Sequence, residues 1–164
     1  MLKQQSVIRV GIADVNIVKE GETIRTSGLG SCVGVVLYDE SKKVGGMVHI
    51  MLPDSAADRS PTLNVAKYAD TGIEALINML IKEGVRTFRL KAKIAGGAQM
   101  FQFGTSDTLK IGPRNVEAVK HALRKASIPI VAERTGGTKG RTIEFDPVTT
   151  TLSIRTVNEE PFTI

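Results

Sequence analysis

Two uninterrupted apolar segments constrain the fold of this 164-residue chain more than any other feature. They cover residues 33–38 and 44–52, and the polar residues 39–43 separate them. Short apolar runs bounded by turn residues are typical of buried strands. We therefore predict a buried β-hairpin inside the fold.

Weaker signals place further elements on both sides of this hairpin. Apolar residues recur at helical spacing over about residues 65–83, with Gly84 suited to end that helix. Residues 111–114 resemble a helix start with Pro113 as the first helical residue, and this helix continues to residue 126. Shorter strands are expected at residues 7–12, 16–19, 23–26, 90–94, 130–133, 142–146 and 151–157. Alternating apolar and basic residues in 90–94 predict a strand with one face in water.

Many short strands and two helices, with strands before and after each helix, predict an α+β fold. The helices should be layered against mostly antiparallel or mixed sheet. With 41% hydrophobic and 24% charged residues, the chain can form one good core. We expect a single domain over residues 1–164.

Composition also excludes several classes of function. No apolar run approaches the roughly 20 residues that span a bilayer, and the N-terminus lacks a signal peptide's apolar stretch. We therefore expect no membrane insertion and a cytoplasmic location, where one cysteine stays reduced. The net charge of +5 is dispersed, and Trp is absent, so a nucleic-acid partner is not expected. An acidic protein partner is compatible with this charge.

Cys32, the only cysteine, is the first candidate for chemistry. An isolated cysteine is often a small buried hydrophobe. Here it follows a loop, residues 27–31, in which Gly28 and Gly30 permit a tight backbone that presents the thiol at a strand start. Backbone N–H groups around Ser27, Gly30 and Ser31 are then candidates for substrate or oxyanion binding. The pattern alone leaves the catalytic and structural interpretations open.

A cysteine nucleophile needs a base, and the chain has two histidines. His121 lies off the core face of the second predicted helix, so we interpret it as a surface residue. His49 lies inside the second apolar run, where its ring nitrogens need partners. It is either a satisfied structural histidine or the base for Cys32, since paired hairpin strands can bring the two together. One cysteine and two distant histidines predict no metal site, and no glycine-rich stretch matches a nucleotide-binding motif, so no cofactor is expected.

Several segments resemble one family. Residues 26–33, Thr-Ser-Gly-Leu-Gly-Ser-Cys-Val, and residues 49–53, His-Ile-Met-Leu-Pro, are similar to those of CheD, the chemoreceptor glutamine deamidases of bacterial chemotaxis. Residues 67–70, 93–101, 111–115 and 135–137 extend the resemblance in consistent order. It covers about residues 7–157. Arg134 departs from the family, in which an acidic residue is expected.

This resemblance implies a layered α/β/β/α fold like that of cysteine hydrolases, and a catalytic triad of Cys32, His49 and Thr26. It also implies that the substrates are glutamines on the helical cytoplasmic domains of methyl-accepting chemotaxis receptors. A second implied partner is the phosphatase CheC, which the family binds and stimulates.

Two alternatives to catalysis remain open. In the first, the chain is a regulatory binding module whose catalytic site is vestigial, and Met100, Phe101 and Phe103 form its partner surface. In the second, Cys32 is a redox-sensing thiol.

Overall fold

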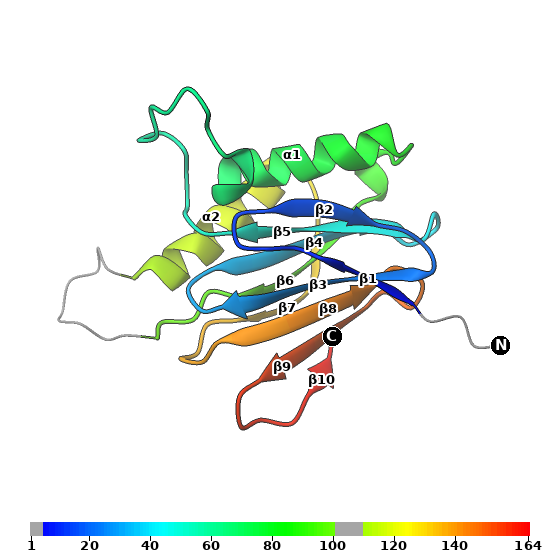
Figure 1. Ribbon diagram of the computed structural model, residues 1–164. Coiled ribbons are helices and arrows are strands. Elements are labelled where there is room, and N and C mark those ends of the chain that lie inside the picture. The colour runs from blue at the N-terminus through cyan, green and yellow to red at the C-terminus, as the bar shows by residue number, and fades with distance from the viewer. Residues whose placement is uncertain (1–4, 101–109) are drawn as a thin grey trace.

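The computed structural model describes residues 5–100 and 110–164. Two five-stranded sheets pack face to face, and two α-helices cover the outer face of one of them (Figure 1). We call that sheet the covered sheet and the other the open sheet. The predicted mixture of two main helices with mostly antiparallel, mixed sheet is confirmed.

The covered sheet has the order β2-β5-β4-β6-β7, and only β6 and β7 are parallel. Every residue of β4 and β5 is buried, because helices lie on one face of this pair and the open sheet on the other. The predicted central hairpin is therefore confirmed. The strands are β2 (Val15–Val18), β4 (Val33–Asp39), β5 (Val44–Ile50), β6 (Lys91–Gly96) and β7 (Ile130–Thr135).

The open sheet has the order β1-β3-β8-β9-β10, with β1 and β3 parallel and the other pairs antiparallel. Burial alternates along β8 and β9, as expected for strands with one face in the core. Ile24, Phe145 and Ile154 pack against Val36 and Met47 of the covered sheet. The strands are β1 (Ser6–Arg9), β3 (Glu22–Leu29), β8 (Arg141–Asp146), β9 (Thr151–Thr156) and β10 (Phe162–Thr163).

The helices α1 (Ala69–Lys82) and α2 (Ile111–Lys125) lie side by side on the covered sheet (Figure 1). α1 buries Ile73, Leu76 and Leu80, which share one face of the helix. The described residues thus form three layers, and the expected fourth, helical layer is absent from them. The outer face of the open sheet instead carries polar side chains such as Arg25 and Arg155, which need no cover.

The helix predicted at residues 65–83 is interrupted. Residues Val65–Lys67 form a short 3-10 helix, η1, and Tyr68 is extended, with φ −113°, where it bridges to Leu52. Gly84 ends α1 as expected, with φ +89°. A second 3-10 turn, η2 (Thr87–Arg89), precedes β6. Pro113 is the third rather than the first residue of α2; the first helical turn tolerates it because those N–H groups have no helical acceptor.

Contrary to expectation, the wet face of β6 is limited to Lys91 at its start, which is partly exposed. Lys93 is only 8% exposed, and its ammonium group donates to the carbonyl oxygen of Thr150. A long lysine stem crosses the apolar interior while its charged end reaches a carbonyl. Within the described residues, no helix has the length and apolar character needed to cross a bilayer.

Candidate active site

Cys32 lies just before the start of β4 and His49 near the end of β5. These two strand ends lie together, at the left in Figure 1. Cys32 immediately precedes β4, in which Gly34 pairs with His49 of β5. Side chains two residues apart on a strand share a face, so Cys32 is a diagonal neighbour of His49. Both face the space between the sheets, where Cys32 packs against the inter-sheet core.

Thr26 reaches His49 from the other sheet. Its hydroxyl Oγ1 lies 2.7 Å from His49 Nδ1 and donates its proton to the carbonyl oxygen of Val10, also at 2.7 Å. A hydroxyl has one proton, so Oγ1 must accept from Nδ1–H. The hydrogen-bond network thereby assigns the tautomer of a neutral ring: Nδ1 carries the proton and Nε2 carries the lone pair.

Nε2 of His49 is buried and has no hydrogen-bond partner among the described residues. The side chain is 0% exposed, and burial lowers its pKa from 6.5 to about 4, because the charged ring loses hydration. At neutral pH the ring is therefore uncharged. The site holds an unprotonated nitrogen that can accept a proton.

The thiol of Cys32 is half-buried. Burial raises the pKa of Cys32, and a hydrogen bond from its own backbone N–H partly offsets this rise. No hydrogen bond joins the thiol to Nε2. The resting pair is consequently a neutral thiol beside a neutral imidazole, not an ion pair.

The segment before Cys32 is held by β6 and its extension. A β-bulge lies between Thr26 and Leu29, where Gly28 has φ +72°. The N–H of Gly97 donates to the carbonyl oxygen of Cys32 at 2.8 Å, and that of Ala98 donates to Gly30 at 2.8 Å. A bulge redirects the strand, and these two bonds fix the redirected backbone.

Asn115 of α2 ties the two ends of the hairpin together. It is fully buried, and its amide nitrogen donates to the carbonyl oxygens of Ser31 and Met51, both at 2.9 Å. Ser31 precedes the cysteine, and Met51 lies two residues after the histidine. One side chain thus holds the backbone next to both reactive groups.

The predicted oxyanion candidates differ in their surroundings. The N–H of Gly30 donates to Gly28 at 3.1 Å, the carbonyl of Ser31 accepts from Asn115, and Ser27 is exposed within β3. Their roles remain predictions. Sequence reasoning assigned no role to Asn115 or to the carbonyl of Val10. The only signal for Asn115 was its place in the matched segment 111–115.

The predicted partner surface is described in part. Met100 is 48% exposed, and its sulfur lies 2.6 Å from the position that a Cβ on Gly30 would occupy. This methionine therefore lies against the loop that leads to Cys32. Phe101 and Phe103 lie outside the described residues.

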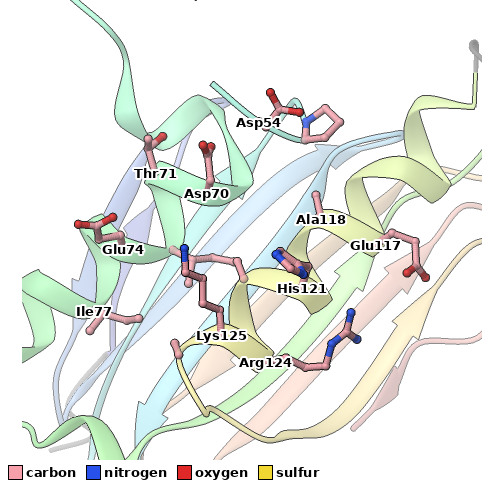
Figure 2. A pocket seen from close by; sticks show the side chains of 14 residues that line it. Asp54, Asp70, Thr71, Glu74, Ile77, Glu117, Ala118, His121, Arg124 and Lys125 are labelled. Carbon is pink, nitrogen blue, oxygen red and sulfur yellow. The ribbon is translucent and has the colours of Figure 1, made fainter. Parts of the chain in front are cut away.

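A groove of about 800 Å³ lies elsewhere, between α1 and α2 (Figure 2). Asp70 and Glu74 of α1 face His121 and Lys125 of α2 across it. His121 is exposed, as expected from the sequence. None of Thr26, Cys32 and His49 lines this groove.

A thiol, an unprotonated buried nitrogen and a hydroxyl that fixes the ring are the groups that a cysteine hydrolase requires. Residues 51–156 match the family model described as CheD chemotactic sensory transduction. A Bacillus licheniformis protein named chemoreceptor glutamine deamidase CheD is 59% identical over 163 residues, covering 99% of this chain and 97% of that protein. The Bacillus subtilis protein of that name is 58% identical, covering 96% of each. The chain belongs to the CheD family.

Among solved structures, the Bacillus licheniformis protein YfiH aligns with a TM-score of 0.47 and 14% identity, covering 82% of this chain and 60% of YfiH.

Proposed function

We propose that this protein is a protein-glutamine deamidase that converts specific glutamines of methyl-accepting chemotaxis receptors to glutamate. The observation that carries the proposal is His49, at the strand ends where the only cysteine lies. Its ring is fixed through Nδ1, and Nε2 has no hydrogen-bond partner in the part of the chain that the structure describes. The names of the relatives, chemoreceptor glutamine deamidase, support the same substrate class. The receptors' cytoplasmic domains imply a cytoplasmic place of work.

In the first half-reaction, the glutamine carboxamide enters beside Cys32. The thiol proton moves to Nε2 of His49 as sulfur bonds to the amide carbon. Burial disfavours both the thiolate and the imidazolium, so proton transfer and attack are coupled rather than sequential. Throughout, Nδ1–H of His49 keeps its hydrogen bond to the hydroxyl of Thr26. This bond keeps Nε2 directed at the reacting groups.

The protonated His49 then gives its proton to the departing nitrogen. The C–N bond breaks, ammonia leaves, and a thioester remains on Cys32. Water then loses a proton to Nε2 and attacks the thioester carbon. The C–S bond breaks, Nε2 of His49 returns its proton to the sulfur, and the thiol is regained as glutamate is released. We assign stabilisation of the oxyanion mainly to the backbone N–H of Cys32, with Ser27, Gly30 and Ser31 lining its approach.

The family resemblance further implies that CheC binds this protein and is stimulated by it. Met100 supports a partner surface next to the catalytic loop, because a half-exposed methionine adapts readily to an apolar partner. The sequence-based prediction assigns Phe101 and Phe103, which lie outside the described residues, to the same partner surface. Its position beside Gly30 implies that CheC and receptor compete for one face.

The proposal is tested by incubating the protein with a chemoreceptor cytoplasmic fragment. Ammonia release and the mass change of each modified glutamine are measured, for the wild type and for Cys32→Ala, with and without CheC. Deamidation that depends on Cys32 and slows with CheC is expected. CheC binding without any deamidation would identify a binding module, and an oxidised Cys32 with no dependence on His49 would identify a redox sensor.

A further inference from the structure

A second polar cavity, of about 320 Å³, lies beyond the end of β7, and we call it the basic pocket. The segment that joins β7 to β8, the adjoining ends of these two strands and the end of β9 with the residues after it form its wall. Its lining residues are Arg134, Thr135, Gly137, Thr138, Lys139, Arg141, Thr156 and Glu159.

Positive charge in the basic pocket exceeds negative charge. Three cations and one carboxylate line it, and Glu159 already pairs with Lys139 at 3.5 Å. Within residues 5–100 and 110–164, Arg134 and Arg141 form no ion pair; Arg134 instead packs over the ring of Phe162, 5.0 Å from its centre. Glu159 acts on Arg141 from a longer range, but one carboxylate does not balance three cations. This excess of positive charge, with two guanidinium groups outside any ion pair, favours the binding of an anion.

Arg141 is held rigidly in this pocket. It is 9% exposed, and its guanidinium donates to the carbonyl oxygens of Gly96 at 3.1 Å and Gly136 at 2.7 Å. Carbonyl oxygens accept hydrogen bonds without neutralising the charge. Burial lowers the pKa of Arg141, the neighbouring charge of Arg134 lowers it further, and Glu159 partly offsets both effects.

The basic pocket and Cys32 lie at the same end of the covered sheet, where β4 begins and β6 and β7 end. Gly96 pairs with Val33 on one side and with Thr135 on the other. Cys32 precedes Val33, so two strand spacings, about 10 Å, separate it from the pocket wall. Gly96 accepts from Arg141, and the next residue, Gly97, donates to Cys32. A single substrate segment can therefore reach both places.

We propose that the basic pocket binds an acidic side chain of the receptor helix that carries the target glutamine. This inference rests on the deamidase function proposed above. A helix rises about 1.5 Å per residue, so a span of 10 Å corresponds to about seven residues, or two turns. Guanidinium groups match carboxylates in shape and charge, so the pocket selects glutamines that have an aspartate or glutamate within two turns.

The test uses two versions of a chemoreceptor cytoplasmic fragment with the same target glutamine. One carries glutamate seven residues before and after that glutamine, and the other carries alanine at both positions. The kcat/KM of deamidation is measured for both with the wild type, Arg134→Glu, Arg134→Gln and the matched control Arg155→Glu. Arg155 is an exposed arginine on the outer face of β9.

We expect the wild type to prefer the acidic fragment by about tenfold, as charge-assisted contacts are lost with alanine. Arg134→Gln should remove the preference and Arg134→Glu should invert it, each measured as the ratio of kcat/KM on the two fragments. A thermal unfolding temperature equal to that of the wild type shows that the variants fold. Arg155→Glu should keep the preference.

Equal wild-type rates on the two fragments, or equal losses on both in the Arg134 variants, would overturn the basic-pocket inference and leave the deamidase proposal intact. If the wild type converts neither fragment, while binding both, the deamidase proposal fails and the pocket inference fails with it.

Discussion

The two histidines of this protein lie in contrasting regions. His121 is exposed in a large groove between helices, among carboxylates and ammonium groups that water already solvates. His49 is buried between two sheets, where Thr26 holds one ring nitrogen and the other has no partner within residues 5–100 and 110–164. The groove between α1 and α2 offers space. The site of Thr26, Cys32 and His49, which we call the strand-end site, instead offers a fixed geometry and an unprotonated nitrogen. We expect reactivity where a polar group is held in place and lacks a hydrogen-bond partner, rather than in a wide surface groove.

The largest contrast should appear in turnover. Cys32→Ala and His49→Ala should each lower kcat for glutamine deamidation by about 10⁴-fold or more, because the two groups act as a unit. His121→Ala should change it less than about twofold, since surface changes far from the chemistry rarely matter. Ammonia release from a receptor fragment measures all three. Retained activity in Cys32→Ala, or a loss in His121→Ala equal to that of His49→Ala, would refute the comparison.

Stability should also distinguish the two histidines. The folded protein holds the pKa of His49 at about 4, against 6.5 for the free side chain, so the unfolded chain binds more protons between these values. The stabilisation is fully present above pH 6.5 and is lost as pH falls towards 4. The loss should amount to about 3 kcal/mol in the free energy of unfolding.

Urea unfolding at pH 7.0 and 4.5 measures this loss. His49→Gln should reduce the difference between the two pH values, because the titrating group is gone. The matched control is His121→Gln. A reduction in that control as large as in His49→Gln would contradict the assignment to the buried ring.

Asn115 gives a way to disturb the strand-end site without touching its reactive atoms. Asn115→Ala removes the bonds to the carbonyls of Ser31 and Met51 and should lower kcat by about 10²-fold, as small displacements of reacting groups do. KM should change little. The rate at which an alkylating reagent modifies the Cys32 thiol should change, because the backbone next to that thiol is displaced. Asn78→Ala, at an exposed asparagine of α1, is the control. If KM rose while kcat stayed constant, Asn115 would contact substrate rather than position the hairpin.

Thr26 should give the smallest effect. Thr26→Val keeps the shape but leaves Nδ1 of His49 without an acceptor, which costs about 1–3 kcal/mol of stability. The ring then loses its fixed orientation, and kcat should fall by about tenfold or more. Thr26→Ser retains the hydroxyl and should restore most of the activity. Equal activity of the serine and valine variants would mean that the hydroxyl does not orient the ring.

The sequence predicted the parts of this molecule that depend on local pattern. The central hairpin, and a histidine within it near Cys32, followed from apolar runs and their lengths. Thr26 came only from the family resemblance, because its bond to His49 joins strands of different sheets that no local pattern aligns. Asn115 and Val10 act through the same kind of distant packing. Lys93 looked solvated because sequence alternation cannot show that a lysine reaches a carbonyl inside the fold.

The hydrogen bond between Thr26 and His49 has one end in each sheet. Its length therefore reports the spacing of the two sheets, and the orientation of the ring depends on that spacing being kept. Any loosening of the sandwich, by heat or by a smaller side chain in the inter-sheet core, releases the ring before the strands separate. Turnover should consequently be lost at a lower temperature than secondary structure. Catalytic activity therefore reports a loosening of the packing between the two sheets before the strands unfold.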